Sequence, residues 1–255
     1  MQAGPFPAEL TPAQRAAASR GSKAMIPLNG RPFLAHVLDR LVQAGFRSVV
    51  MILGPGQEEV RDFLRSGESP RIPVGTLVQE RPLGTAHAVA TAEDFAAGEP
   101  AVFLNGDNLY PAAGLAALRQ LGSAGLLGFR RSTLLRQGNI AATRINSFAL
   151  IDIDGLGHLT RIAEKPGPEQ AAGFGNDPLV SMNAWLLPAT IYPACREIRL
   201  SPRGELELQD AVRRVMERRT ERFTVLECPE GVLDLTTPAD ILEVERRLRA
   251  AAASS

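Results

Sequence analysis

Asp107 follows a short apolar stretch, in the sequence Ala101-Val102-Phe103-Leu104-Asn105-Gly106-Asp107-Asn108. The apolar residues predict a buried strand, and ligands of open α/β sheets bind at the carboxyl ends of the strands. A lone carboxylate in such a place typically binds a divalent metal or a ribose hydroxyl. The alternative is a plain turn, because Gly, Asn and Asp dominate turns for backbone reasons. This stretch alone leaves both interpretations open.

A second carboxylate, Asp234, lies in a short apolar stretch just before a helix opened by Pro238. Two aspartates from distant segments can share one Mg²⁺, a hard cation that prefers oxygen ligands. A capping or helix-dipole role for Asp234 is the alternative. Lys23 and Lys165 occur at similar junctions, and lysine is a point charge suited to phosphate, although a solvated surface position is the commoner fate of a lysine.

A third polar group follows the predicted strand over residues 74–79. It contains Gln79, Gly84 and Thr85, with a helix predicted from Thr85 onward. Gly followed by Thr at a helix start offers backbone N–H groups to an anion or to the edge of a base. Ordinary loop and capping chemistry is the alternative.

Composition and missing motifs exclude several classes of function. Lys+Arg and Asp+Glu both number 28, so the basic excess of a nucleic-acid binder is absent. There is no apolar run of membrane-spanning length, and no secretory signal is evident. With only two cysteines, a reduced, cytoplasmic location is the simplest expectation. The three histidines have no partners at informative spacing, and no nucleophile, dinucleotide-binding or Walker motif occurs.

Strands and helices alternate in the first half of the chain. Strands are expected at 48–53, 74–79 and 101–104, and helices at 32–42, 57–65 and 85–95. Such alternation predicts an α/β fold with a mostly parallel sheet and right-handed crossovers. Later segments predict strands at 125–129, 148–153, 159–163, 179–187, 223–228 and 232–235, with a hairpin turn at 154–157, and helices at 113–121, 208–219 and 238–248. Thr237 is a plausible N-cap of the last helix.

We expect a single domain over residues 1–255. Residues 1–22 are expected to be irregular apart from a weak helical patch at 12–19, and the tail 250–255 is expected to be frayed.

Seven segments, taken in order, resemble motifs of the sugar-1-phosphate nucleotidylyltransferases. They are Lys23–Leu34, Gln79–Ala88, Phe103–Asn108, Glu164-Lys165-Pro166, Ser181–Trp185, Arg203–Asp210 and Leu233–Pro238. The resemblance covers residues 22–248 and implies a Rossmann-like, three-layer nucleotidyltransferase fold with a mixed, mostly parallel sheet.

The resemblance also implies roles for individual residues. Lys23 would contact the nucleotide phosphates, and Gln79 with the backbone of Gly84 and Thr85 would bind the nucleotide. Asp107 and Asp234 would hold Mg²⁺. Glu164 would contact the sugar hydroxyls, Lys165 the sugar phosphate, and Asn183 would line the sugar site.

The implied reaction joins an NTP and a sugar 1-phosphate into an NDP-sugar and releases pyrophosphate. The phosphate oxygen attacks the α-phosphorus in line and is already anionic, so no general base is required. Lys23, Asp107 and Lys165 are the expected catalytic residues. The loop with Gln79 and Gly84 favours a pyrimidine nucleotide, while the sugar and the oligomeric state, including a homo-oligomer, stay open.

The sequence departs from the family at its beginning. Family members place a strand and a glycine-rich loop, of the form "LAAG-GTRL", just before the lysine segment, whereas residues 1–10 contain neither. We therefore expect a missing central strand and triphosphate cradle, caused by a late gene start or a truncation, and little pyrophosphate release by the chain as given. The alternatives are a non-catalytic relative that binds a nucleotide or sugar, and a nucleotidyltransferase acting on a non-sugar phosphate.

Overall fold

The computed structural model describes residues 5–69 and 72–253. Most predicted elements form, within a few residues of their expected ends. The helices are α1 (Pro12–Ser19), α2 (Phe33–Gln43), α3 (Glu58–Arg65), α4 (Thr85–Thr91), α5 (Glu93–Ala96), α6 (Ala112–Gln120), α7 (Arg131–Gln137), α8 (Pro168–Ala172), α9 (Ile191–Glu197), α10 (Leu208–Glu217) and α11 (Asp240–Ala253), with 3-10 turns η1 (Lys23–Met25) and η2 (Ala142–Ser147). The strands are β1 (Pro27–Leu28), β2 (Arg31–Pro32), β3 (Val49–Leu53), β4 (Val74–Val78), β5 (Ala101–Phe103), β6 (Asn108–Leu109), β7 (Gly125–Arg130), β8 (Ala149–Ile153), β9 (Leu159–Ala163), β10 (Leu179–Leu187), β11 (Thr224–Glu227) and β12 (Leu233–Asp234).

The longest strand, β10, organises the main sheet, whose order is β11-β7-β10-β8-β9. The first residues of β10 pair with β8, and its last residues pair with β5. The strands β5, β7 and β11 run in one direction, and β10 runs against them. The expected mixed, mostly parallel α/β architecture is confirmed, and the hairpin at 154–157 joins β8 to β9.

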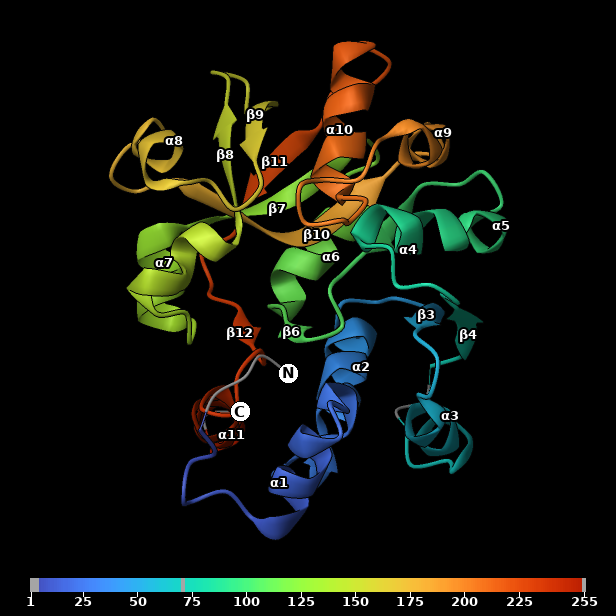
Figure 1. Cartoon of the computed structure of the whole chain (residues 1–255), viewed down its shortest axis with the longest axis vertical. Coiled ribbons are helices and arrows are strands. Elements are labelled where there is room, and N and C mark those ends of the chain that lie inside the picture. The colour runs from blue at the N-terminus through green and yellow to red at the C-terminus, as the bar shows by residue number, and fades with distance from the viewer. Residues whose placement is uncertain (1–4, 70–71, 254–255) are drawn as a thin grey trace.

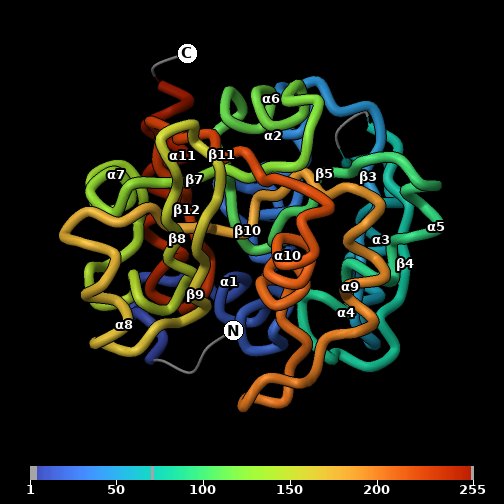
Figure 2. The backbone as a smooth tube through the Cα atoms, turned by 90° about the horizontal axis from the view of Figure 1, so that it is seen from above, coloured from blue at the N-terminus to red at the C-terminus, as the bar shows by residue number. Residues whose placement is uncertain are grey.

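Alternate residues of β10 pack into two separate cores. Met182, Ala184 and Leu186 belong to one core, together with apolar residues of α2, α6 and α7. Trp185 and Leu187 belong to the other, together with residues of α4, α9 and α10. Because successive side chains of a strand point to opposite faces, these cores lie on the two faces of the sheet. Figures 1 and 2 show the same division, with α2 beside α6 and with α4, α9 and α10 grouped together.

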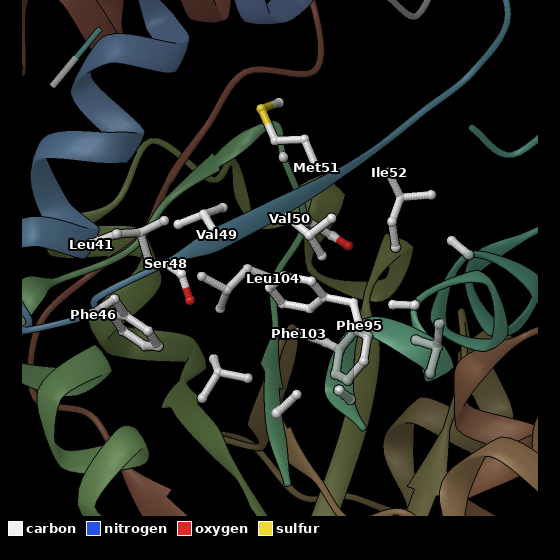
Figure 3. Close-up of a pocket in the computed structure, with 18 of the residues that line it drawn as sticks. Leu41, Phe46, Ser48, Val49, Val50, Met51, Ile52, Phe95, Phe103 and Leu104 are labelled. Atoms are coloured by element: carbon white, nitrogen blue, oxygen red, sulfur yellow. The ribbon is translucent and has the colours of Figure 1, made fainter. Parts of the chain in front are cut away.

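The parallel pair β3–β4 is separate from the main sheet. In the part of the chain that the structure describes, β3 pairs with β4 alone and β5 pairs with β10 alone. A cavity of about 620 Å³ lies between β3 and β5 (Figure 3).

The two ends of the chain pack together against β6 and β12. Leu10 and Ala17 lie in a third core with Leu109, Leu235 and Val244. Residues 12–19, expected to be only weakly helical, form α1 with a complete capping box between Thr11 and Gln14. Residues 1–4, part of the segment expected to be irregular, lie outside the described residues.

Three differences from the sequence predictions concern helices. The helix expected at 85–95 is divided into α4 and α5 at Ala92. The closing helix begins at Asp240 and runs to Ala253, beyond the expected end at 248, while residues 254–255 of the tail are not described. Thr237 is not the N-cap: its hydroxyl donates to the Asp240 carboxylate, which also accepts the backbone N–H groups of Thr236 and Thr237. No helix in the described ranges has the length and apolarity needed to cross a bilayer.

Candidate active site

Asp107 lies in the turn between β5 and β6, and Tyr110 anchors this turn to the sheet. The Tyr110 hydroxyl donates to the carbonyl of Met182 at 2.5 Å and accepts the N–H of Asn105 at 3.3 Å. Burial, foremost, raises the pKa of Tyr110 well above its usual value, so this hydroxyl stays a neutral donor. The turn is therefore fixed against β10 by a buried hydrogen bond.

Lys23 pairs with Asp107 across 84 positions of sequence. Lys23 Nζ lies 2.7 Å from Asp107 Oδ2, and both side chains are half-buried, with 23% and 29% exposed. The pair sits where β5 ends, at the place that the sequence predicted for a phosphate or metal site. A half-exposed ion pair of this kind can exchange its internal partner for an anionic or cationic ligand without being left unpaired in the interior.

Asp234 is close to Asp107 but has a different environment. Its carboxylate is 3% exposed, Oδ1 accepts from Asn108 Nδ2 at 3.2 Å and from Thr236 Oγ1 at 3.0 Å, and Oδ2 pairs with Arg144. Arg144 also donates to both oxygens of Asp240. Burial is the largest influence on the pKa of Asp234 and raises it, and the nearby Asp107 raises it further, while Thr236 and Arg144 lower it.

The loop with Gln79, Gly84 and Thr85 is tied to a distant segment. Gln79 Nε2 donates to the carbonyl of Gly84 at 3.1 Å and lies 2.9 Å from His87 Nδ1. Thr85 Oγ1 accepts the N–H of Leu208, and Ala86 donates its N–H to Leu206. The helix start that was expected to offer free N–H groups is therefore partly used within the protein, and among the described residues no hydrogen-bond partner of Gln79 Oε1 is found.

Glu164 and Lys165 follow β9 and face Arg203. The Arg203 guanidinium lies 2.5 Å from Glu207 and 3.7 Å from Glu164, and Lys165 Nζ lies 3.9 Å from Glu164. Burial, foremost, raises the pKa of Glu164, and the neighbouring Glu207 adds to the rise, whereas Lys165 and Arg203 lower it. Two cations and two carboxylates thus form one mixed-charge group.

Asn183 occupies an irregular point of β10. The pairing with β7 shifts register between Ser181 and Trp185, and Asn183 has a left-handed backbone with φ 59°. Its Oδ1 accepts from Gln209 Nε2 at 2.8 Å and from Trp185 Nε1 at 3.3 Å. The bulge turns this one polar side chain out of the regular alternation of the strand.

The predicted residues thus fall into two groups. Lys23, Asp107 and Asp234 gather around the turn after β5. The second group lies beside residues 201–209: Thr85, Glu164 and Asn183 contact Leu208, Arg203 and Gln209, respectively. Gly84 packs beside Leu206, while Gln79 and Lys165 join the group through Gly84 and Glu164. Tyr110 joins the groups, since its hydroxyl also lies 3.5 Å from the carbonyl of Asn183.

Comparison with known families shows the family of the chain. Residues 17–250 match the model of the nucleotidyl transferase family. The chain belongs to this family. Its predicted membership is therefore confirmed by a match over most of its length.

Relatives of this nucleotidyl transferase include several sugar-phosphate enzymes. A low-salt glycan biosynthesis nucleotidyltransferase of Haloferax volcanii is 29% identical over 77% of the chain and 52% of its own length. A glucose-1-phosphate thymidylyltransferase of Actinoplanes is 26% identical over 90% of the chain and 72% of its own length. A UTP–glucose-1-phosphate uridylyltransferase of Haloferax volcanii is 25% identical over 89% of the chain and 88% of its own length. The chain spans about half the length of the first of these relatives.

Solved structures confirm the fold. A UDP-glucose pyrophosphorylase complexed with UDP-glucose superposes with a TM-score of 0.73 and 16% identity, covering 90% of both chains. A UTP-bound UDP-glucose pyrophosphorylase of Acinetobacter baumannii gives a TM-score of 0.71 at 16% identity, over 89% of this chain and 85% of the other. At 16% identity the similarity to these structures shows a shared fold.

The two aspartates fit a metal ion unequally. Asp107 has one carboxylate oxygen paired with Lys23, and no hydrogen-bond partner of its other oxygen is found within the described residues. Both oxygens of Asp234 are already engaged, and Arg144 supplies the positive charge beside it. No cluster of three or more His, Cys, Asp or Glu side chains suited to a metal occurs in residues 5–69 and 72–253. Asp107 therefore suits a cation better than Asp234 does.

Several residues of this site were not singled out from the sequence. Arg144, Asn108 and Asn139 surround Asp234, and Asn139 both accepts its N–H and donates to its carbonyl. Arg203 and Gln209 lie in a recognised motif, yet their contacts with Glu164 and Asn183 depend on tertiary structure. An arginine and an asparagine in an irregular segment carry no periodicity that could have marked them.

Gly84→Ala should destabilise the protein by about 2–4 kcal/mol, because the backbone strain of a positive φ and the steric clash of the new Cβ both raise the free energy of the folded state. Gly84 has φ 111°, and an added Cβ would lie 2.6 Å from the carbonyl oxygen of Leu206. Gly56→Ala is the matched control, since Gly56 has φ 77° in open space and should cost only about 1 kcal/mol. Urea unfolding measures both, and equal losses would show that the contact with Leu206 is unimportant.

Glu164→Gln should become progressively more stable than the parent as pH rises. A raised folded-state pKa contributes stability that is present below the ordinary value of 4.5 and is lost as pH rises through the folded pKa. Glu197→Gln should show the opposite trend, because Arg218 lowers the pKa of Glu197. Unfolding free energies between about pH 3 and pH 8 test the signs, because the change for Glu197 falls below its ordinary value and that for Glu164 above it. A parallel pH dependence for both variants would contradict this account.

Proposed function

We propose that this chain transfers a nucleotidyl group from an NTP to a sugar 1-phosphate and releases pyrophosphate. The observation that carries the proposal is the half-exposed Lys23–Asp107 pair at the end of β5, in a chain that matches the nucleotidyl transferase family over residues 17–250. The named activities of the thymidylyltransferase and uridylyltransferase relatives support it.

Lys23 neutralises phosphate charge in this proposal. Its ammonium is 23% exposed and would exchange Asp107 for a phosphate of the nucleotide. The attacking oxygen of a sugar phosphate is already anionic, so catalysis consists of alignment and charge stabilisation. This explains why the site contains cations and carboxylates but no residue placed as a nucleophile among those described.

The group around Glu164 is the proposed sugar-phosphate side. Lys165 is 47% exposed and Arg203 35% exposed, and either can bind an anionic phosphate. The carboxylate of Glu164 lies beside both cations, and its oxygens would accept hydrogen bonds from sugar hydroxyls. Asn183 is held by Gln209 through Oδ1, which turns its amide N–H₂ toward a ligand as a donor.

Gln79 and Gly84 are the proposed base-binding residues, with a preference for a pyrimidine. Gln79 donates to Gly84 and to His87, so its orientation is fixed before a nucleotide binds. The free Oε1 atom can accept the N–H of a uracil or thymine ring. Relatives named as a uridylyltransferase that uses UTP and as a thymidylyltransferase are in keeping with this preference.

Mg²⁺ is the proposed metal, held by Asp107, with Asp234 as a second ligand when Arg144 releases it. Oxygen ligands and substrate phosphates are the partners that Mg²⁺ prefers. When bound, the ion would neutralise charge on the phosphates. In its absence Lys23 and Arg144 balance the two carboxylates.

Asp107→Asn should lower pyrophosphate release by at least about 10²-fold relative to the parent chain, even though the parent's own release is expected to be small, because it removes a charge at the reacting phosphates. The measurement is pyrophosphate release from UTP, dTTP, CTP, ATP and GTP with glucose 1-phosphate. Asp152→Asn is the matched control, since Asp152 pairs with Arg161 on the β8–β9 hairpin and should leave turnover unchanged. Undiminished turnover in Asp107→Asn would contradict the proposal. So would a chain that uses a non-sugar phosphate but none of the sugar phosphates tried.

Arg144→Ala should tighten Mn²⁺ binding, because it frees Oδ2 of Asp234 for the metal. Mn²⁺ titrations followed by electron paramagnetic resonance measure this without turnover. Asp107→Asn should weaken Mn²⁺ binding about tenfold or more, whereas Asp234→Asn should change it little as long as Arg144 is present. Equal losses in Asp107→Asn and Asp234→Asn would show instead that the two aspartates share the metal equally.

A further inference from the structure

Asn183 lies between the two groups of polar residues. It borders the same cavity as Gly106, next to Asp107, and as Thr85 at the start of α4. Its backbone N–H donates to Ser181 Oγ at 3.4 Å. Its side-chain Nδ2, in contrast, has no hydrogen-bond partner among the described residues and is open to solvent. The amide nitrogen is therefore the part of Asn183 that is left for a ligand.

Trp185 determines which way the Asn183 amide points. An indole N–H can only donate a hydrogen bond, and Trp185 Nε1 lies 3.3 Å from one atom of this amide. That atom is therefore the oxygen, Oδ1. Gln209 Nε2 donates to the same oxygen at 2.8 Å. Rotating the amide by half a turn would place its N–H groups against both of these donors.

Both inner donors are on rigid supports. Trp185 is fully buried, and its ring meets the ring of Phe223 edge to face, with the centroids 5.9 Å apart. Gln209 is 1% exposed and lies in the first turn of α10. A buried donor that loses its partner pays the full cost of its desolvation. The Asn183 amide therefore has one stable orientation, with both of its own N–H groups toward the ligand side.

We propose that Gln209 and Trp185 are positioning residues that hold the Asn183 amide as a fixed donor, so that the site selects a sugar 1-phosphate with an oxygen acceptor at this point and rejects one with an ammonium group there. The inference rests on the proposed function, because it assigns the class of sugar that the same site takes. A hydroxyl, carbonyl or carboxylate oxygen accepts a hydrogen bond from Nδ2, whereas an ammonium group only donates. A site built around a hydrogen bond discriminates strongly against a ligand that cannot form it.

The selectivity comes from the two inner donors and not from Asn183 alone. An asparagine that is free to rotate offers its oxygen to an amine as readily as its nitrogen to a hydroxyl. A serine or threonine hydroxyl would also serve both kinds of ligand. Gln209 and Trp185 remove this freedom, because they occupy the amide oxygen on the inner side.

Binding to the full chain tests the proposal without turnover. The probes are glucose 1-phosphate and four analogues, in which an amine that is protonated at the working pH replaces the hydroxyl at C2, C3, C4 or C6. Titration calorimetry gives the dissociation constant of each analogue relative to that of glucose 1-phosphate. We expect the parent chain to bind at least one analogue about tenfold more weakly, because two donors then face each other.

Asn183→Asp should reverse this preference. The new carboxylate has the same shape as the amide, keeps an oxygen against Gln209 and Trp185, and places an acceptor where Nδ2 was. The analogue that the parent chain rejects should then bind about tenfold better relative to glucose 1-phosphate. Gln209→Leu should lower the discrimination by about threefold or more, because the amide is then held by one weaker contact.

Gln14→Leu is the matched control for Gln209→Leu. Gln14 is also a buried glutamine, 3% exposed, and its Nε2 donates to the carbonyl of Pro27. It belongs to α1, whose residues pack in the third core. Gln14→Leu should therefore cost stability and leave every binding ratio unchanged.

A spectroscopic signal follows the inner contact directly. Trp185 is the only tryptophan of the chain, so its indole N–H gives a single signal in a ¹H–¹⁵N correlation spectrum. Asn183→Asp should move this signal downfield, because a charged acceptor forms a shorter and stronger hydrogen bond. Gln14→Leu should leave the signal in place.

The outcomes separate this inference from the proposed function. A reversed preference in Asn183→Asp, together with a displaced indole signal, supports the inference. Equal binding ratios in the parent chain and Asn183→Asp, or equal effects of Gln209→Leu and Gln14→Leu, would overturn it even in a chain that releases pyrophosphate. An indole signal that does not move in Asn183→Asp would overturn it as well, whichever sugar phosphate binds.

Discussion

The hydrogen bond from the Tyr110 hydroxyl to the carbonyl of Met182 is the contact on which the site depends. It fixes the turn that carries Asp107 against the bulge that carries Asn183, and so it relates the two groups of polar residues to one strand. The bond is buried, and losing a partner of a buried polar group costs more than the bond itself contributes. A strand with two cores on its faces is a rigid support for such a contact.

The fold was largely predictable because its signals are local. Apolar runs such as 125–129 and 179–187 predicted strands, and Pro-initiated apolar periodicity predicted helices such as α2. Short segments were missed, since none of them shows a full period of apolar residues between clear boundaries; they are η1, β1, β2, β6, α7, η2, α8 and α9. Thr237 was assigned as a cap from its type, but its hydroxyl donates to the carboxylate of Asp240 and so is not available to accept a backbone N–H of the first helical turn in the way an N-cap does.

The candidate site was predictable only in part, for a physical reason. Asp107 and Lys23 could be marked because each follows a strand or turn where ligands bind, and the structure brings them to 2.7 Å. The sequence could also mark Asp234, but not that Arg144 pairs with it. An ion pair between positions 144 and 234 depends on how an irregular segment packs against β12, and charge at a distant position leaves no local pattern. The contacts of residues 201–209 with Thr85 and Glu164 also depend on tertiary packing and leave no local pattern in the sequence.

The position of Gln79 relative to Asp107 follows from these tertiary contacts. Gln79 directly follows β4, which pairs with β3, while Asp107 follows β5, which pairs with β10. Because β3 and β5 do not pair with each other, sheet hydrogen bonds do not set the distance between the two residues. The backbone bonds between Leu83 and Leu206 and between Ala86 and Leu206 do so instead, by linking the Gln79 loop to the segment before α10. A nucleotide that reaches from Gln79 to Lys23 would therefore bridge two parts of the sheet that these backbone bonds link.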